Sequence, residues 1–455
     1  MTSKKQESIH EPARAQKRFG VLCPVVAAIV LLTLSGSQAA AQEPETKYSV
    51  LYNFCSQPNC ADGADPSGGV IRDEAGNLYG TTSYGGRSGA GVVFKLDPSE
   101  KETVLYNFTG GADGGNPNGS LIRDEAGNLY GTAGGGSSGA GVVFKLDRER
   151  NETVLYSFCS QTNCADGAGP NSLIRDERGN LYGTTQDGGV SCPLETKGCG
   201  VVFKLDPAGK ETVLYSFCSQ THCVDGAFPG VLIRDERGNL YGTAQYGAYG
   251  SGVVFRLDPS GTETVLYSFC SQTDCADGDY PTDLIRAEHG SLYGTTAFGG
   301  NSNCTFGFPP PPFGCGMVFK LDRSGRETVL YSFTAADGAF PDSLTLGDGD
   351  RWNPAGNLYG AAEGGGNLSS PICDQFGGEG CGVVFELDRW GKERVLHIFQ
   401  GPDGMSPRGL LTYHDSLYGI TAYGGPAIGE GNAGAGVIFK IKLDDDNDHD
   451  HEIDH

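Results

Sequence analysis

Seven tandem copies of one sequence unit occupy almost the whole chain. Each copy contains a Leu-Tyr-Gly triplet, and the triplets begin at Leu78, Leu129, Leu181, Leu240, Leu292, Leu358 and Leu417. Two other segments recur in each copy. One is Gly-Val-Val-Phe or a close variant. The other is Leu-Tyr-x-Phe, which becomes Leu396-His397-Ile398-Phe399 in the seventh copy. Self-similarity at a spacing of 51 to 66 residues indicates a repeat architecture rather than several unrelated domains.

Each copy predicts four short β-strands. In the third copy they cover residues 172–176, 180–185, 200–206 and 211–217, where Val, Leu, Tyr, Phe and Thr dominate and Gly, Asp, Asn and Pro form the boundaries. The connections at residues 177–179 and 207–210 have the length and the glycine of tight hairpins. The chain has 72 glycines in 455 residues, a composition that argues against a helical bundle, a coiled coil or a Rossmann enzyme.

Four antiparallel strands repeated seven times predict an all-β, seven-bladed β-propeller over residues 42–443. A parallel β-helix is the alternative, but its rungs are shorter. The ends of the chain favour the propeller. One lone strand at 48–54 comes first, and three strands at 409–413, 416–422 and 436–443 come last. The first strand therefore should complete the last blade and remove the free sheet edges.

The unit resembles known propeller repeats. The Leu-Ile-Arg-Asp-Glu-x-Gly-Asn-Leu-Tyr-Gly segment is similar to NHL-type and two-component-regulator repeats, and that resemblance implies that 172–176 is an innermost strand and 211–217 an outermost one. The whole unit closely resembles the GloVer tandem repeats of secreted bacterial proteins over residues 48–443. This resemblance implies an exported, surface-associated protein and no known reaction. The chain differs from that pattern after Leu443, where no apolar tail follows.

Cysteines are confined to one predicted face of the ring. Both short hairpins of every unit share one face, and the connection after Leu-Tyr-Gly and the crossing to the next blade share the other. Fourteen cysteines follow the leader, in pairs that are present or absent together, which favours local disulfides over zinc ligation. The expected disulfides are Cys55–Cys60, Cys159–Cys164, Cys192–Cys199, Cys218–Cys223, Cys270–Cys275, Cys304–Cys315 and Cys373–Cys381.

The crossing connections share an Asp-Gly-x-x-Pro signature. Its aspartates are Asp62, Asp113, Asp166, Asp225, Asp277, Asp337 and Asp403. The simplest interpretation is a turn in which the carboxylate accepts nearby backbone N–H groups. The alternative is a ring of carboxylates near the channel mouth that binds Ca²⁺ weakly, although one carboxylate per blade is sparse for a cation that takes six to eight oxygens. No other cofactor is expected.

Two segments stand outside the repeat pattern. Cys304 and Cys315 bracket a Pro- and Phe-rich stretch in which Phe306, Phe308 and Phe313 either pack on a neighbouring blade or contact a partner. Residues 444–455 form an acidic, His-containing tail. We expect it to be disordered, with weak metal binding as the alternative, because it lacks the glycine and the glutamate of an EF-hand loop.

Residues 1–41 have the pattern of a secretory signal peptide. A basic start precedes an apolar run at 19–34 and an Ala39-Ala40-Ala41 cleavage site, with an uncleaved anchor as the alternative. The remaining chain has 28 Lys and Arg against 54 Asp and Glu, a net charge of −26. Such a surface repels nucleic acid and anionic membranes. We expect a secreted, extracellular or periplasmic monomer without membrane insertion.

No catalytic constellation is present in the sequence. The chain lacks a P-loop motif, and His222, His289, His397 and His414 are isolated. These observations predict a non-enzymatic protein that binds a glycan or a protein through its loop-rich face. The alternative is a propeller enzyme, such as a metal-dependent lyase or a glycosidase. An enzyme should break the repeat symmetry with a few charged residues at the channel mouth.

Overall fold

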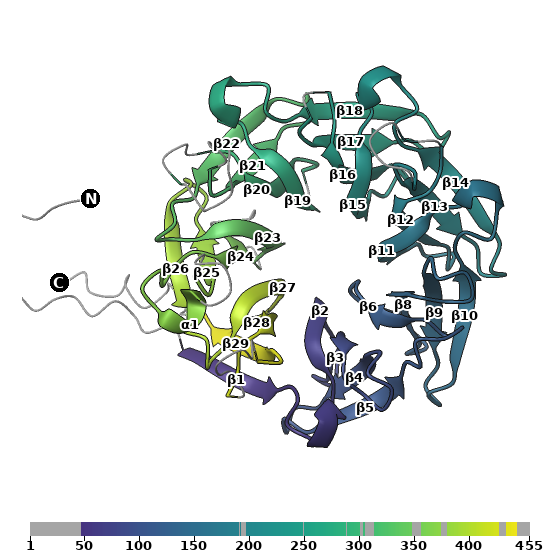
Figure 1. Ribbon diagram of the computed structural model, residues 1–455. Coiled ribbons are helices and arrows are strands. Elements are labelled where there is room, and N and C mark those ends of the chain that lie inside the picture. Colours follow the sequence, from purple (N-terminus) through teal and green to yellow (C-terminus); the bar gives the residue numbers. More distant parts are fainter. Residues whose placement is uncertain are drawn as a thin grey trace, which may run out of the picture. The chain divides into compact units, whose positions relative to one another are not determined.

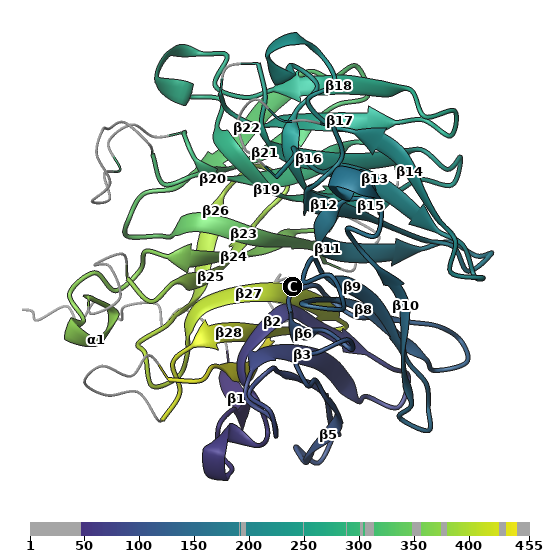
Figure 2. The same cartoon turned by 45° about the vertical axis from the view of Figure 1, so that its right-hand side comes forward.

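Seven four-stranded antiparallel blades arranged in a ring make up the protein (Figures 1 and 2). The computed structural model describes residues 47–190, 192, 197–248, 250–287, 289–300, 304, 314–347, 356–374, 380–426 and 434–443. The predicted signal peptide at 1–41 and the acidic tail at 444–455 lie outside the described residues. The fold class predicted from the repeats, a seven-bladed β-propeller, is confirmed.

Four strand positions recur from blade to blade. The innermost strands are β2 (Ala64–Arg72), β6 and β7 (Gly115–Pro117 and Ile122–Arg123), β11 (Ala168–Arg175), β15 (Ala227–Arg234), β19 (Asp279–Arg286), β23 (Ala339–Leu346) and β27 (Met405–Tyr413). The second strands are β3 (Leu78–Tyr84), β8 (Leu129–Gly134), β12 (Leu181–Asp187), β16 (Leu240–Tyr246), β20 (Leu292–Phe298), β24 (Leu358–Gly364) and β28 (Ser416–Tyr423). The third strands are β4 (Val92–Leu96), β9 (Val142–Leu146), β13 (Val201–Leu205), β17 (Val253–Leu257), β21 (Met317–Leu321), β25 (Val383–Leu387) and β29 (Val437–Lys442). The outermost strands are β5 (Glu102–Asn107), β10 (Glu152–Ser157), β14 (Glu211–Ser216), β18 (Glu263–Ser268), β22 (Glu327–Ser332), β26 (Glu393–Ile398) and β1 (Lys47–Asn53).

The last blade is built from both ends of the chain. Strand β1 pairs antiparallel with β29, so that the strand order is β1-β29-β28-β27. The first strand therefore takes the outermost position, as the count of strands at the two ends of the sequence indicates. Figure 1 shows this blade, with purple β1 lying beside yellow β29.

A glycine and a phenylalanine on neighbouring strands explain two of the repeated segments. Gly183 of Leu-Tyr-Gly is directly opposite Phe203 of Gly-Val-Val-Phe in the β12–β13 register. A β-carbon at Gly183 would lie 2.7 Å from the Phe203 ring, closer than real β-carbons approach other atoms. The Phe203 ring also meets Phe158, which follows the outermost strand of the previous blade, at 4.9 Å between centroids. Both rings are fully buried, so the packing joins neighbouring blades.

The short hairpins are closed by a repeated aspartate. In the third blade, Asp176 accepts the N–H of Asn180 at 2.8 Å and the hydroxyl of Tyr182 at 3.1 Å. This tyrosine is the one in Leu-Tyr-Gly. The glycine of that triplet therefore makes room for a core phenylalanine, and its tyrosine donates a hydrogen bond to the turn. The equivalent Asp124 is also close to Arg175 of the following blade, whose charge helps to lower the pKa of Asp124 against the opposing effect of burial.

Helical structure is limited to single turns in the connections. Four 3₁₀ turns lie between paired cysteines: η1 (Pro58–Cys60), η2 (Thr162–Cys164), η3 (Thr221–Cys223) and η4 (Thr273–Cys275). One α-helical turn, α1 (Pro371–Asp374), follows β24. Within the described part of the chain, no helix has the length and apolar character needed to cross a membrane.

Candidate functional site on the loop-rich face

Two kinds of connection define what we call the loop-rich face. These are the connection after each second strand and the crossing from each outermost strand to the next blade. All seven disulfides lie in these connections, and each joins the neighbouring cysteines named above. Disulfides of this number are typical of proteins that fold in an oxidising compartment. The stretch with Phe306, Phe308 and Phe313 lies outside the described residues, so its proposed partner contact stays a prediction.

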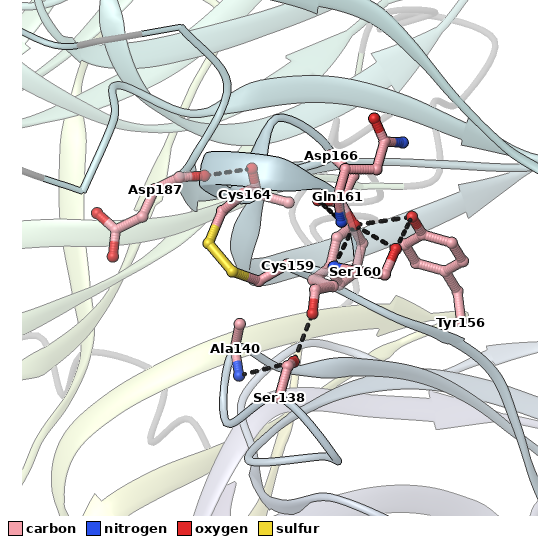
Figure 3. The surroundings of a disulfide bond; sticks show 11 residues. Ser138, Ala140, Tyr156, Cys159, Ser160, Gln161, Cys164, Asp166 and Asp187 are labelled. Atoms are coloured by element: carbon pink, nitrogen blue, oxygen red, sulfur yellow. Dashed lines mark hydrogen bonds between the residues drawn. A yellow bond between two sulfur atoms is a disulfide. The ribbon is translucent and has the colours of Figure 1, made fainter.

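The repeated crossing-loop aspartates form turns at the outer rim. Asp166 accepts the hydroxyl of Tyr156 on outermost strand β10 at 2.8 Å and the N–H of Ser160 at 2.9 Å (Figure 3). All seven aspartates have such a partner on an outermost strand, a tyrosine in six blades and His397 in the sixth blade. These contacts match the first interpretation of the signature, a turn, and weak Ca²⁺ binding by a ring of these carboxylates stays a prediction. The carboxylates accept hydrogen bonds in their own loops, beside the outermost strands, because each has to close the turn that follows its strand.

One group of three metal-ligating side chains exists among the described residues. It consists of Cys192, Cys199 and Cys218. Cys192 and Cys199 are bonded to each other, and Cys218 is bonded to Cys223. Sulfur atoms in disulfides are not thiolates and therefore are poor metal ligands. This cluster consists of two adjacent disulfides.

Inner strands begin on the loop-rich face with a residue of positive φ followed by proline. The seven residues before the prolines have φ angles of 49° to 66°, and they are Asp65, Asn116, Gly169, Phe228, Tyr280, Phe340 and Ser406. A bulky residue in this left-handed region costs about 1–3 kcal/mol and persists only where its surroundings enforce it. Hydrogen bonds between blades provide the enforcement. For example, the N–H of Phe228 donates to the carbonyl of Cys199 at 2.9 Å, and that of Phe340 donates to Cys315 at 3.0 Å.

The residue after each proline links neighbouring blades, but not in every blade. Ser67, Asn171 and Thr282 donate to the proline carbonyl of the next blade at 2.7 to 2.8 Å, and Asn118 does so at 3.3 Å. The fourth, sixth and seventh blades carry Gly230, Asp342 and Arg408 at this position. Glycine has no side-chain donor, and an ionised carboxylate has no proton to donate. The repeat symmetry is therefore broken in the sector that runs from the fourth blade to the seventh.

A pocket of about 570 Å³ lies in this sector. We call it the axial pocket, and its lining is Gly230, Gln245, Tyr280, Pro281, Thr282, Ala297, Phe298, Phe340, Asp342 and Glu363. Phe298 meets Tyr280 edge to face at 5.9 Å and Phe340 at 5.5 Å between ring centroids. Two of these three rings belong to the strained positions before proline. Aromatic walls with a few polar groups are typical of pockets for small ligands.

A charged cluster borders the axial pocket. Arg408 Nη2 is 2.9 Å from Glu363 Oε1, and the two residues come from neighbouring blades. Burial lowers the pKa of Arg408, but the negative charges of Glu363, Asp342 and Asp65 outweigh that effect and raise it. Burial raises the pKa of both Asp342 and Asp65, while the charge of Arg408 opposes the rise. One guanidinium group therefore faces three carboxyl groups.

A partly buried carboxyl group links two inner strands beside this cluster. Asp283 accepts the N–H of Leu284 at 2.8 Å and the N–H of Leu344, in the next blade, at 2.7 Å. Burial, with a smaller contribution from the charge of Asp342, raises the pKa of Asp283 to about 6. Asp283 holds the strand on which Asp342 lies, so it positions the wall of the pocket.

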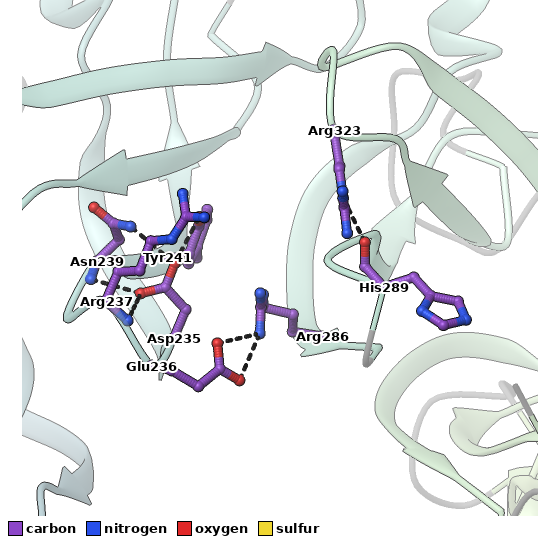
Figure 4. A network of polar contacts seen from close by, with 8 residues as sticks. All are labelled: Asp235, Glu236, Arg237, Asn239, Tyr241, Arg286, His289 and Arg323. Atoms are coloured by element: carbon purple, nitrogen blue, oxygen red, sulfur yellow. Dashed lines mark hydrogen bonds and ion pairs between the residues drawn. The ribbon is translucent and has the colours of Figure 1, made fainter.

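The opposite end of the ring, the hairpin face, carries charged grooves. In the fourth blade, Asp235 accepts the N–H groups of Arg237 and Asn239 and closes its turn (Figure 4). Glu236 reaches Arg286 of the fifth blade at 3.3 Å. Two grooves of about 500 and 350 Å³ run between blades here, and charged side chains of both signs line them. These contacts hold turns and neighbouring blades together.

The fold and its site define a disulfide-rich seven-bladed β-propeller with a loop-rich face. The chain belongs to the Gloeobacter/Verrucomicrobia repeat family, whose sequence profile matches residues 38–230 and 161–372. This confirms the family that the repeat resembles. A search of curated protein sequences found no match.

Solved structures that resemble the chain share its fold alone. A fungal alcohol oxidase in complex with copper is 13% identical with a TM-score of 0.52, and the match covers 88% of this chain and 77% of the oxidase. The extracellular domain of a one-component system from B. thetaiotaomicron is 13% identical with a TM-score of 0.50, covering 88% of this chain and 42% of that one. A gluconolactonase from Xanthomonas campestris is 14% identical with a TM-score of 0.40, covering 88% and 90%.

Sequence reasoning missed the axial pocket and its charged cluster. Asp65, Asp342, Glu363 and Arg408 are far apart in the chain, and each is the only acidic or the only basic residue at its repeat position. A comparison of the residue after proline across the seven copies would have found two of them, because Asp342 and Arg408 are the only charged residues among Ser, Asn, Asn, Gly, Thr, Asp and Arg.

Proposed function

We propose that this protein is an exported, non-enzymatic binding protein that holds a glycan or protein ligand at the axial pocket of its loop-rich face. The observation that carries the proposal is the break in repeat symmetry. Gly230 leaves space where other blades place a side chain, and Tyr280, Phe298 and Phe340 present aromatic surface beside it. Export is supported by the pattern of residues 1–41 and by the seven disulfides.

One disulfide is hydrogen-bonded to the wall of the axial pocket. The carbonyl of Cys315 accepts the N–H of Phe340, so the Cys304–Cys315 bridge anchors one aromatic wall. A rigid aromatic wall reduces the entropy lost when a ligand binds.

A screen of the chain from residue 42 onward against glycan and protein panels tests the function. We expect at least one ligand whose binding falls tenfold or more when Phe298 is replaced by alanine. Trp390→Ala is the matched control, because Trp390 is an aromatic residue of the hairpin face with 75% of its surface exposed. Binding that is lost with Trp390→Ala and kept with Phe298→Ala would contradict the choice of face.

A second function, glycoside hydrolysis, is favoured by one feature of the pocket. Asp342 and Glu363 both line it, and their environments differ: Glu363 is paired with Arg408, whereas Asp342 makes no hydrogen bond among the described residues. Glycosidases use two carboxyl groups with distinct protonation states. Release of reducing ends from a bound oligosaccharide, abolished by Asp342→Asn, would establish this activity over simple binding.

A further inference from the structure

We propose that the axial pocket recognises a saccharide that carries a protonated amino group, such as an oligomer of glucosamine. This inference rests on the proposed binding function and specifies its ligand. It is carried by three features in and beside the pocket: a carboxyl group without a hydrogen-bond donor, aromatic walls, and buried hydroxyl groups that lack a partner.

The carboxyl groups in and beside the pocket favour a positively charged ligand. Asp342 and Glu363 line it, and Asp65 is close to the same guanidinium group. Arg408 is engaged by Glu363, and Asp342 has no hydrogen-bond donor among the described residues. A half-buried carboxylate without a donor is poorly solvated, and an ammonium group on a ligand would supply both a countercharge and donors. The net charge of −26 beyond the leader would also draw a cationic ligand toward the protein.

The aromatic walls suit a sugar ring with an amino substituent. Tyr280, Phe298 and Phe340 are each partly exposed and meet edge to face, so their rings present faces and edges at different angles. The C–H groups of a pyranose pack on aromatic faces, and an ammonium group gains further from a ring within about 6 Å. A volume of about 570 Å³ is within the usual range for small-ligand sites and admits a short oligosaccharide.

Buried hydroxyl groups supply the third feature. In the third blade, Thr184 Oγ1 donates a hydrogen bond to the carbonyl of Gly230 at 2.6 Å. The same oxygen accepts a hydrogen bond from Asn171 Nδ2 at 3.2 Å. In the fourth blade the residue equivalent to Asn171 is Gly230, and Thr243 Oγ1 is buried without a partner among the described residues. Thr243 Oγ1 is 3.2 Å from where a β-carbon at Gly230 would lie.

Two further unpartnered atoms lie on the inner strands of this sector. Ser343 Oγ, next to Asp342 in the chain, and Arg408 Nε are likewise buried without an acceptor or donor in the described structure. Leaving a buried polar group without a hydrogen bond costs about 1–3 kcal/mol. The hydroxyl groups of a saccharide that enters beside Gly230 would satisfy such atoms, whereas an apolar ligand would not.

The repeat itself provides variants that close the pocket without harming the fold. Gly230→Asn restores the residue of the second and third blades, fills the space over Thr243 and recreates the hydrogen bond to the next proline carbonyl. Asp342→Thr restores the residue of the fifth blade and removes the carboxylate. Glu236→Gln removes one charge on the hairpin face and serves as the control for overall electrostatics, because the Glu236 side chain is 84% exposed.

Isothermal titration of the chain from residue 42 onward with glucosamine trisaccharide, cellotriose and trilysine tests the inference. We expect the glucosamine trisaccharide to bind at least tenfold more tightly than cellotriose. Gly230→Asn and Asp342→Thr should each weaken its binding tenfold or more with an unchanged or higher melting temperature, and Glu236→Gln should change it less than twofold.

Each contrary outcome has a distinct meaning. Equal affinity for cellotriose would overturn the need for an amino group while leaving the binding function intact. Tighter binding of trilysine would assign the pocket to a basic protein segment and overturn the saccharide. If Glu236→Gln weakens binding as much as the pocket variants do, the effect comes from the overall charge of the protein, and the proposed site is overturned. Absence of binding by all three probes would overturn this inference, and the proposed function would fail separately if the full glycan and protein panels also returned nothing.

Discussion

At the scale of single residues, the residues that recur in each copy contact one another. Gly183 leaves room for the Phe203 ring, and Tyr182 between Leu181 and Gly183 closes the hairpin through Asp176. His397 shows that the outer-rim contact tolerates a change of chemistry. It replaces the tyrosine of six other blades, bonds to Asp403 at 2.9 Å and stacks on Tyr48 at 3.8 Å.

Replacing Gly183 by alanine should destabilise the protein by about 1–3 kcal/mol, because the added carbon overlaps the ring of Phe203 in a tightly packed core. Urea unfolding measures the change. Gly111→Ala, in a crossing loop with its nearest neighbour at 3.2 Å, should stay within about 0.5 kcal/mol of the parent. Equal effects at the two positions would refute the role assigned to the Gly–Phe pair.

At the scale of secondary-structure elements, the outermost strands begin with a buried acid. Glu263 has one carboxylate oxygen buried without a partner, and so do its equivalents in five other blades, Glu102, Glu152, Glu211, Glu327 and Glu393. Burial, and then the negative charge of Asp225 in the preceding crossing loop, raises the pKa of Glu263 to about 7. The other five have their pKa raised to about 7 by the same two causes.

These glutamates predict that stability falls from pH 5 to pH 8. A carboxyl group whose pKa is higher in the folded state stabilises the fold below its unfolded pKa, and this contribution disappears as the pH rises through about 7. The hairpin aspartates, such as Asp176, have a lowered pKa and act in the opposite direction, since their contribution is lost in more acidic solution. The melting temperature should therefore be highest at mildly acidic pH.

Glu263→Gln isolates one member of the set. Because Glu263 is only half-buried, the variant should gain about 1 kcal/mol or less at pH 8 and nothing at pH 5. Glu149→Gln, an equal change of charge at an exposed position of a hairpin, is the control. A pH profile of stability that is identical for parent and Glu263→Gln would contradict the account of these strands.

The disulfide-clipped connections belong to the same scale. Mapping of peptides under non-reducing conditions should find all seven neighbour pairs and no bridge between blades. Removing the Cys304–Cys315 or the Cys55–Cys60 bridge by serine substitution should cost about 2–3 kcal/mol. Only the loss of Cys304–Cys315 should also weaken binding, because Cys315 holds Phe340 through its carbonyl.

At the scale of the whole molecule, both ends of the chain close the ring. Deletion of residues 46–54 should remove β1 and leave the edge of β29 unpaired. We expect a broad, non-cooperative unfolding transition or aggregation. A truncated protein that unfolds as sharply as the parent would contradict the importance of this closure.

The architecture could be predicted from the sequence because it is repeated. Leu-Tyr-Gly and three further strand patterns occur seven times, so a strand that is ambiguous in one copy can be assigned from the others. The count of strands at the two ends of the chain indicates the closure of the ring. The site could not be predicted in the same way. Asp342 and Glu363 become neighbours of Arg408 only when the ring places the sixth blade beside the seventh. The distance of the Asp-Gly-x-x-Pro aspartates from the axis could not be predicted either, because spacing in sequence carries no information on radius.

Hydrogen–deuterium exchange with and without bound ligand tests most directly whether this propeller binds through the axial pocket. With the tightest ligand from the panels, protection should be concentrated at the beginnings of β19 and β23, the ends of β20 and β24, and the connection that holds Cys315. The hairpins of the opposite face should exchange at the same rate with and without ligand. Protection confined to those hairpins, with unchanged exchange around Phe298 and Asp342, would contradict the account.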